Sequence, residues 1–248
     1  MRERLITSIA IVFVLVVVGV INNFYLTSLL VGIISVAGLY EAKKLFGIEN
    51  ERIFYALSLF SFLPLVIDPL VVGVLGVIGV SGYVAYFQRK INLISLALYP
   101  FLPLMLLLEL YYRFGLFFVI WLIVIIALTD SFAYLIGKSF GKTFFKEGFS
   151  PTSPNKSWEG VIGGVMVGSI IGAFVGLREF NFLEAFFIAI LVSIVSVFGD
   201  LFESYLKRKA GVKDSGSILP GHGGILDRID GYLFGAPLMW AILYAMGH

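Results

Sequence analysis

Apolar segments long enough to cross a bilayer follow one another along the whole of this chain. The 248 residues are 59% hydrophobic and only 14% charged, whereas soluble domains carry about 25% charged residues. A soluble fold of this length has too little interior to bury so many large apolar side chains. The sequence therefore predicts an all-α, polytopic integral membrane protein.

Charge clusters and turn residues divide the chain into about nine segments, and a transmembrane helix needs roughly 20 apolar residues. We place these helices near residues 5–22, 24–42, 53–67, 69–88, 93–112, 115–136, 158–177, 182–206 and 229–246. The first five form an N-terminal region of membrane spans, residues 1–113. The rest form a C-terminal membrane region, residues 114–248, with two polar loops at 137–157 and 207–228.

Positive charge sets the predicted orientation. With nine spans, the N-terminus and the connections after the second, fourth, sixth and eighth spans share one side of the membrane. All but two of the 18 Lys and Arg residues, from Arg2 and Arg4 to Arg228, lie on that side; the exceptions are Arg113 and Arg178. By the positive-inside rule that side faces the cytoplasm. We therefore expect a multi-pass protein of the inner cell membrane with a cytoplasmic N-terminus.

The seventh predicted span carries a glycine at every fourth position. These glycines are Gly160, Gly164, Gly168, Gly172 and Gly176. They make one stripe along a helix and let a neighbouring helix backbone approach closely, so structural packing is the favoured interpretation. Such a stripe also permits a homodimer. Gly73, Gly76, Gly79 and Gly82 are expected to act in the same way in the fourth span.

Acidic and basic side chains gather at the predicted cytoplasmic ends of the last spans. A charge inside a span costs roughly 2.5–3.5 kcal/mol on insertion scales, so charged residues at these positions need a reason. They lie in four stretches, residues 130–141, 153–160, 199–209 and 211–231. Because all four lie on one side of the predicted topology, they predict a single cytoplasmic site at the membrane boundary.

One of these stretches places two carboxylates and a hydroxyl on the same face of a helix. The residues, at i, i+3, i+4 and i+7, are Asp200, Glu203, Ser204 and Lys207. Such a face can ligate a hard cation, while an ion pair with Lys207 is an equally good explanation. Asp227 and Asp230, at i and i+3 after a glycine-rich loop, favour the cation. Oxygen ligands in a chain without Cys indicate magnesium rather than zinc.

Basic residues and glycines beside these acids favour a metal-bound polyphosphate as ligand. The basic residues are Lys207, Arg208, Lys209, Lys213 and Arg228. Gly221, Gly223 and Gly224 offer backbone N–H groups that could cradle phosphate. Anionic lipid headgroups are the simpler explanation of a basic patch, but such a patch gains nothing from acids such as Asp214. His222, flanked by glycines, could hydrogen-bond a phosphate or position a base.

The stretch from Ser204 to Asp230, SYLKRKAGVKDSGSILPGHGGILDRID, resembles the signature of the phosphatidate cytidylyltransferases, or CDP-diacylglycerol synthases. The matching elements are Ser204, Lys207-Arg208, Lys213-Asp214, Leu219-Pro220, His222-Gly223-Gly224 and Asp227-Arg228-x-Asp230. Upstream elements of that family match Asp130 with Ala133-Tyr134 and Gly137, Ser153-Pro154 with Lys156-Ser157 and Glu159-Gly160, and Gly199-Asp200. Asn155 departs from the family, where many members have lysine, so any phosphate contact there passes to Lys156 or is dispensable.

The resemblance implies an enzyme of phospholipid biosynthesis that converts CTP and phosphatidic acid to CDP-diacylglycerol and pyrophosphate, with one or two magnesium ions. It implies metal ligands at Asp200 and Asp227, to which we add Glu203. The predicted catalytic residues are Lys207, Arg208, Lys213, Asp214, His222, Arg228 and Asp230. The predicted substrate-binding residues are Asp130, Lys156, Ser157, Ser204, Gly223 and Gly224. CTP, phosphatidic acid and the bilayer are the expected partners, and nucleic acid is not.

Two other functional classes explain parts of the pattern. A transporter would place charges at the middle of the membrane in two corresponding half-repeats, and this sequence shows neither feature. A CTP-dependent polyprenol or phytol kinase would also join CTP to a lipid. It would transfer the γ-phosphate and release CDP, so its products distinguish it from a cytidylyltransferase.

Overall fold

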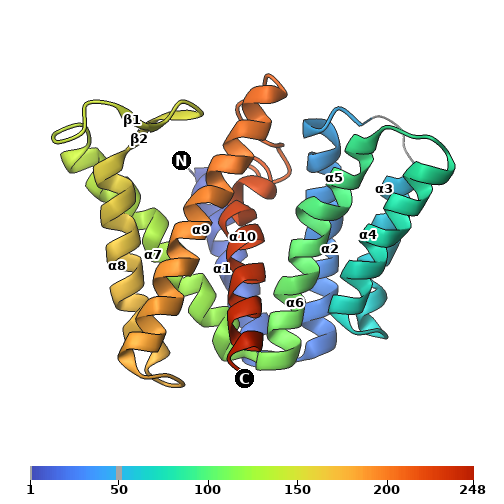
Figure 1. Cartoon of the computed structure of the whole chain (residues 1–248), viewed down its shortest axis with the longest axis horizontal. Coiled ribbons are helices and arrows are strands. Elements are labelled where there is room, and N and C mark those ends of the chain that lie inside the picture. Colours follow the sequence, from blue (N-terminus) through green and yellow to red (C-terminus); the bar gives the residue numbers. More distant parts are fainter. Residues whose placement is uncertain (1, 49–51) are drawn as a thin grey trace. The chain divides into compact units, whose positions relative to one another are not determined.

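The computed structural model describes residues 2–48 and 52–248, and side chains from Leu5 onward. The side chains of Arg2 and Arg4 therefore lie outside the described residues. The chain is 77% helix and 4% strand, so the all-α prediction is confirmed. The helices are α1 (Arg2–Ile21), α2 (Phe24–Leu45), α3 (Arg52–Phe60), α4 (Pro69–Tyr86), α5 (Ile94–Leu96), α6 (Leu102–Phe114), α7 (Leu116–Phe140), α8 (Trp158–Gly176), α9 (Phe182–Lys209) and α10 (Leu226–Ala245) (Figure 1).

Shorter elements complete the fold. The 3₁₀ turn η1 (Leu63–Leu65) follows α3, and the 3₁₀ turn η2 (Ile91–Leu93) precedes α5. A π-helical segment, η3 (Ala97–Phe101), leads into α6. Strands β1 (Gly148–Ser150) and β2 (Ser153–Ser157) form an antiparallel hairpin between α7 and α8. This hairpin lies in the predicted polar loop at 137–157.

Each of the nine predicted spans coincides with a helical segment, and six segments within the described residues are long and apolar enough to cross a membrane. These six are Phe24–Leu45, Pro69–Tyr86, Ile91–Phe114, Leu116–Phe140, Trp158–Gly176 and Phe182–Lys209. Two shorter apolar segments, Leu5–Ile21 and Arg52–Leu65, match the first and third predicted spans. The ninth predicted span corresponds to α10. The first turns of this helix carry Asp227, Arg228 and Asp230. A membrane protein is thus supported, while the count of nine spans is not confirmed.

Capping residues fix where several helices begin. The Asn23 side chain accepts a hydrogen bond from Leu26 N–H at the start of α2, and Asp68 accepts from Leu70 and Val71 N–H at the start of α4. Pro69 occupies the first turn of α4, where its missing N–H costs nothing. Such caps satisfy N–H groups that have no partner inside the helix. The short turns expected at these places are therefore stabilised locally.

The chain forms two compact units. The first unit comprises Met1–Leu116 and Leu206–Ile229, and the second comprises Phe117–Tyr205 and Asp230–His248. Because α9 and α10 each continue from one unit into the other, the loop at 207–228 belongs to the first unit. The remainder of the predicted site belongs to the second.

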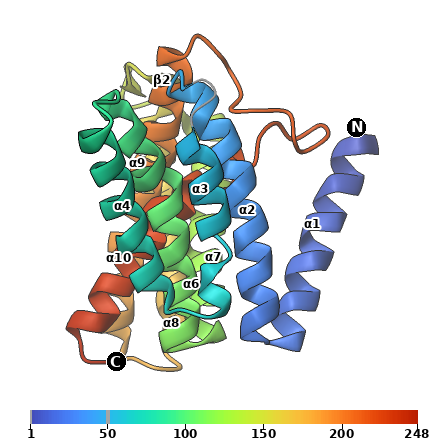
Figure 2. The same cartoon turned by 90° about the vertical axis from the view of Figure 1, so that its right-hand side faces the viewer.

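The first unit is built around α2, α4 and α6, which pack side by side (Figure 2). Gly73 and Gly76 of α4 face the first turns of α6 and η3, where an added Cβ would crowd Leu102 and Phe101, whereas Gly79 and Gly82 face open space. The packing expected of the four glycines is thus confirmed for two of them.

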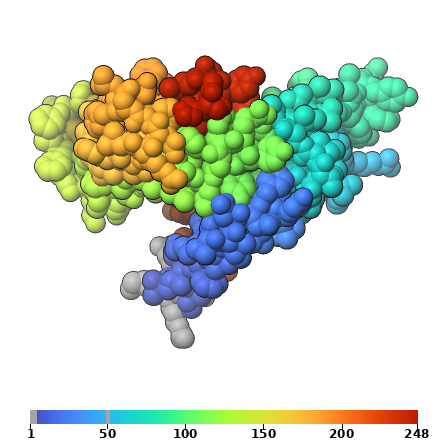
Figure 3. All heavy atoms as spheres, turned by 90° about the horizontal axis from the view of Figure 1, so that it is seen from below, coloured from blue at the N-terminus to red at the C-terminus, as the bar shows by residue number. Residues whose placement is uncertain are grey.

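Helix α1 diverges from α2 above their shared turn (Figure 2). Its apolar side chains stay exposed, for example Phe13 at 66% and Val20 at 80%. The space-filling view shows this helix in blue at the margin of the first unit (Figure 3). An apolar surface of this kind suits contact with lipid.

In the second unit the glycine stripe of α8 packs against α7. A Cβ at Gly160, Gly164 or Gly168 would collide with the backbone or side chains of Ala133 and Thr129 on α7. Trp121 Nε1 donates to the Gly172 carbonyl at 2.7 Å across the same contact. The predicted packing role is confirmed. Because the stripe is buried within its own chain, it no longer supports a homodimer.

Candidate active site

Asp227, in the first turn of α10, is held by four hydrogen bonds within the first unit. Its Oδ1 accepts from Lys207 Nζ at 2.6 Å. Its Oδ2 accepts from the N–H of Ser215 at 3.0 Å, from the Ser215 hydroxyl at 2.9 Å and from the N–H of Gly224 at 2.8 Å. These donors meet because the loop between α9 and α10 folds back over the start of α10. Only 8% of the Asp227 side chain is exposed.

The charge of Asp227 is stabilised by these contacts. Partial burial by itself would raise the pKa of this carboxyl, but the Lys207 ammonium together with the Gly224 N–H and the Ser215 hydroxyl lowers the pKa of Asp227 below its ordinary value. The ionised Oδ1 atom therefore faces a cationic group. A metal cation could bind this oxygen only in place of the Lys207 ammonium.

The glycine-rich loop is tied to both α10 and α1. Arg228 donates through Nε and Nη2 to the His222 carbonyl oxygen at 3.2 and 2.9 Å. The Nε2 atom of His222 lies 3.0 Å from Ser8 Oγ, and Thr7 Oγ1 donates to the Pro220 carbonyl at 2.9 Å. Among the described residues, the buried Nδ1 of His222 has no hydrogen-bond partner. Its burial keeps this nitrogen out of contact with solvent.

The other predicted residues of this loop divide into exposed side chains and structural glycines. Arg208, Lys213 and Asp214 are exposed, so a soluble nucleotide can reach them. Gly223 has φ of +82°, a left-handed conformation that favours glycine. The N–H of Gly224, predicted to cradle phosphate, instead donates to Asp227. Gly224 therefore serves to shape the surroundings of that carboxylate.

The second unit brings acidic residues of three helices near one another. Lys156 of β2 makes an ion pair with Asp200 of α9, which also accepts from Ser204 Oγ at 3.4 Å. Asp130 of α7 lies within electrostatic range of Asp200 and Lys156. Asp230 of α10 lies within the same range of Asp200, Asp130 and the fully buried Glu203.

A close approach of two backbones brings Asp230 toward the acids of α9. A Cβ added at Gly199 would lie 2.5 Å from the Asp230 carbonyl oxygen, so only glycine permits this separation. The acidic stretches predicted to converge do so within the second unit for Asp130, Asp200, Glu203 and Asp230.

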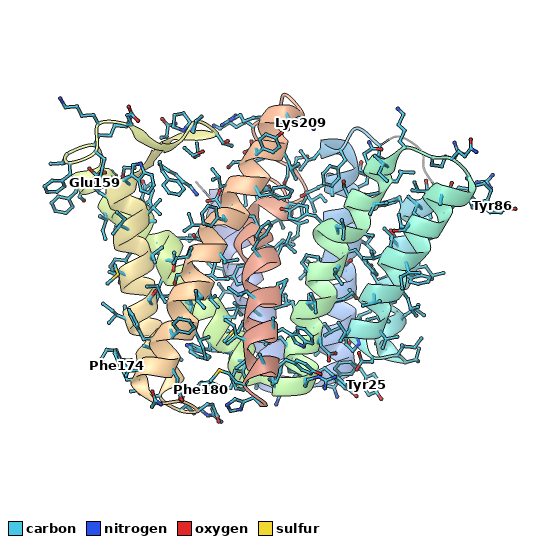
Figure 4. All side chains as sticks on the ribbon, viewed as in Figure 1. Tyr25, Tyr86, Glu159, Phe174, Phe180 and Lys209 are labelled. Carbon is cyan, nitrogen blue, oxygen red and sulfur yellow. The ribbon has the colours of Figure 1, made fainter. Side chains whose placement is uncertain are left out.

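The β-hairpin that carries Lys156 is anchored to the start of α8. Ser157 Oγ caps the helix by accepting from Gly160 N–H at 3.1 Å. Glu159, labelled in Figure 4, accepts from the N–H groups of Phe144 and Phe145 at 2.8 and 2.9 Å. Both side chains fix the segment that follows α7 onto α8. Ser157, predicted as a substrate contact, acts here as a helix cap.

The donors at Asp200 and Asp227 fit a hard cation. Within the described part of the chain, no three His, Asp or Glu side chains form a group that could hold a metal ion. Magnesium, however, keeps several waters and needs only one or two protein carboxylates. Asp200 and Asp227 each direct a carboxylate oxygen to a lysine ammonium group, so each offers an oxygen at a position that favours positive charge.

Comparison with known proteins places the chain in a family. The sequence model of the cytidylyltransferase family matches residues 2–246. The chain belongs to this family. The resemblance inferred from the stretch at 204–230 is therefore confirmed. The match also extends over the N-terminal spans, which hydropathy alone could not assign.

Three similar proteins from different bacteria share the name phosphatidate cytidylyltransferase. A phosphatidate cytidylyltransferase of Helicobacter pylori is 38% identical over 98% of this chain and 92% of its own length. One of Aquifex aeolicus is 33% identical over 90% of this chain and 91% of its own. One of Thermotoga maritima is 47% identical over a shorter part, 46% of this chain and 44% of its own length. Family membership makes this chain a nucleotidyltransferase.

Glu41 belongs to the candidate site and was missed by sequence reasoning. This carboxylate of α2 is fully buried and accepts hydrogen bonds from Ser215 Oγ, Ile225 N–H and Leu226 N–H. The available signal was an acid inside an apolar span, which is costly unless it has partners. Its partners lie 174 to 185 residues further along the chain, so local patterns could not identify them.

Proposed function

We propose that this chain transfers the cytidylyl group of CTP to phosphatidic acid, forming CDP-diacylglycerol and pyrophosphate. The observation that carries this proposal is 33–38% identity, over nearly the whole chain, with proteins named phosphatidate cytidylyltransferase. Apolar helices support the lipid substrate, because its acyl chains can stay in the bilayer while the headgroup reaches helix ends. Exposed basic residues of the 207–228 loop support a soluble, polyanionic second substrate.

The reaction needs no nucleophilic side chain. A phosphate monoester has a second pKa of about 6, so phosphatidate is largely a dianion at neutral pH. One of its phosphate oxygens attacks the α-phosphorus of CTP, the bond from that phosphorus to the bridging β-phosphate oxygen breaks, and pyrophosphate leaves. The protein's task is positioning together with stabilisation of the charge that develops on the leaving group.

The residues of the first unit suit that task. Arg208 and Lys213 are exposed and can pair with phosphate oxygens of CTP or pyrophosphate. Lys207 is held on Asp227, and Arg228 orders the loop through the His222 carbonyl. His222 connects the loop to α1 through the contact of its Nε2 with Ser8 Oγ. In the second unit, Lys156 is the basic residue beside the acids and is a second candidate for a phosphate contact.

Magnesium binding is part of the proposal. Asp227 in the first unit and Asp200 in the second, the latter with Glu203, would each supply ligands to magnesium, one or two ions in all, and the ligand atoms are oxygens as magnesium prefers. When bound, magnesium neutralises triphosphate charge and polarises the phosphoryl group under attack. Asp130 and Asp230 then act as contacts to the nucleotide or to waters of the ion.

Membrane orientation also belongs to the proposal. Nine spans in an inner membrane, with the N-terminus and both polar loops in the cytoplasm, account for the one-sided distribution of Lys and Arg. A tag at the C-terminus should then be labelled by an impermeant reagent from outside intact cells. Labelling that requires permeabilised cells would contradict the nine-span count. A homodimer stays a prediction without support from the buried glycine stripe.

A product assay tests the central proposal. Purified protein receives phosphatidic acid, magnesium and CTP labelled either in the cytidine or at the γ-phosphate. Cytidine label in the lipid phase, with γ-label in pyrophosphate, is the expected result. γ-Label in lipid with release of CDP would instead identify a CTP-dependent lipid kinase. No label in lipid from demonstrably folded protein would refute both.

A further inference from the structure

We infer that Glu41 is a positioning residue that fixes the start of α10, and with it Asp227, for the cytidylyl transfer proposed above. Glu41 lies on α2, far from the signature in sequence, and is 0% exposed. All of its partners described above belong to the loop before α10 or to the first residue of that helix. The effect on catalysis rests on the proposed function, whereas the role of Glu41 in holding the start of α10 does not.

Helix α10 begins without a capping side chain of its own. The residue before Leu226, the first residue of α10, is Ile225, which offers no oxygen to the unpaired N–H groups of the first turn. Glu41 supplies that oxygen from another helix. Its Oε1 accepts from Ile225 N–H at 3.0 Å, and its Oε2 accepts from Leu226 N–H at 2.9 Å. A carboxylate at a helix N-terminus is also favoured by the helix dipole.

The same carboxylate is connected to Asp227 through one hydroxyl group. Ser215 Oγ lies 3.0 Å from Glu41 Oε2 and 2.9 Å from Asp227 Oδ2. Gly224 is pressed between these groups, since a Cβ there would collide with Ser215 Oγ and Glu41. Any displacement of the Glu41 carboxylate therefore displaces the donors that orient Asp227.

The backbone of α2 is shaped for this contact. Gly38, one turn before Glu41, faces the start of α10, where its Cβ would lie 3.3 Å from Leu226 Cδ2. Gly216 faces Glu41 itself and also leaves no room for a side chain. Two glycines, Gly216 and Gly224, thus border the buried carboxylate. This packing is consistent with a fixed position for Glu41 and not with a solvated acid at the end of a span.

The variant Glu41→Gln tests the inference because it keeps the size of the side chain and exchanges one acceptor oxygen for a donor NH₂ group. Glu109→Gln is the matched control: Glu109 is also fully buried in the first unit, but it is paired with Arg113 and not with the loop. Both variants and the wild type are reconstituted in lipid nanodiscs. Hydrogen exchange of the 211–229 peptides is measured together with kcat and the KM for phosphatidic acid.

We expect Glu41→Gln to accelerate exchange at Ile225 and Leu226 by about tenfold or more, and to lower kcat about as much, since one lost hydrogen bond to a charged acceptor is worth at least that factor. The KM for phosphatidic acid should stay within about twofold, because the hydrogen-bond partners of Glu41 given above are not among the proposed substrate contacts. Glu109→Gln should leave exchange of these peptides and kcat unchanged.

Distinct results would overturn the inference. Wild-type exchange in Glu41→Gln, or a loss of folded protein at unchanged kcat per folded molecule, would each refute a positioning role. If Glu41→Gln does not fold, Ser215→Ala cuts the same link; unchanged kcat and unchanged exchange in that variant would also refute it. If the wild type makes no CDP-diacylglycerol, the proposed function fails, and exchange alone decides whether Glu41 holds the loop.

Discussion

Asp227 of the first unit and Asp200 of the second carry the same functional group and each pairs with a lysine, yet their surroundings differ. Asp227 accepts four hydrogen bonds, three of them on Oδ2, and its side chain is 8% exposed. Asp200 is 31% exposed and pairs with Lys156 of a β-hairpin and with Ser204 in its own helix. Asp227 is enclosed between the first turn of α10 and the loop before it, while Asp200 is partly exposed.

The difference shows how differently the two carboxylates are held within their own units. Because backbone N–H groups hold Oδ2 of Asp227, the Oδ1 atom keeps one direction whether or not Lys207 occupies it. Asp200 has no backbone donor among its described hydrogen bonds, so its carboxylate can adjust when a substrate or ion arrives. We expect Asp227 to keep a fixed geometry in the first unit and Asp200 to be the more adaptable carboxylate in the second.

The largest expected effect is loss of turnover in Asp227→Asn or Asp200→Asn. Each change removes one negative charge from a proposed ligand of magnesium, and activity should fall by about a thousandfold or more. The measurement is synthesis of labelled CDP-diacylglycerol by protein shown to be folded and inserted. Wild-type synthesis by either variant would exclude that aspartate as a metal ligand.

A second prediction concerns stability and compares the two lysines. Lys207→Met leaves the Asp227 charge nearly buried, and breaking such a pair should lower the free energy of unfolding by about 3 kcal/mol. Lys156→Met breaks a pair in which both side chains are 31% exposed, and solvent screening limits its cost to about 0–1 kcal/mol. Thermal unfolding of both variants in the same detergent measures the difference. Equal destabilisation would show that the two environments are equivalent.

The smallest expected effect is that of Asn155→Lys, which restores the lysine found in many family members. Asn155 is exposed on β2 next to Lys156, so an added charge should lower the KM for CTP by only about two- to threefold. Steady-state kinetics at low salt provide the measurement, with Asn155→Gln as the uncharged control. An equal change in both variants would exclude a phosphate contact at this position.

Much of the fold followed from local patterns. All nine predicted segments are helical, since long apolar runs leave few other ways to satisfy the backbone in a membrane. Within α6, Glu109 and Arg113 lie four residues apart and pair at 2.8 Å, as local helix spacing allows. The small hairpin at 148–157 was not predicted, because its short polar strands are too brief to show a pattern.

The candidate site followed from the sequence only in part. The signature located Asp227, Lys207 and His222, because these residues lie in one continuous stretch. Two roles differ from expectation, since the Gly224 N–H binds Asp227 and Ser157 caps α8. Both depend on which donor the folded backbone brings nearest, and residue type does not reveal that.

The sequence alone determined residence in a membrane, the family and the identity of the charged residues, because apolar length, charge distribution and a long signature are all local properties. Only the tertiary structure decided which carboxylate accepts a hydrogen bond from each donor. Glu41 illustrates the reason: it closes a hydrogen-bond network with residues 174 to 185 positions away. Buried hydrogen-bond donors in proteins are almost always paired with an acceptor. The packing of α2 against the start of α10 determines which acceptor each of these donors has.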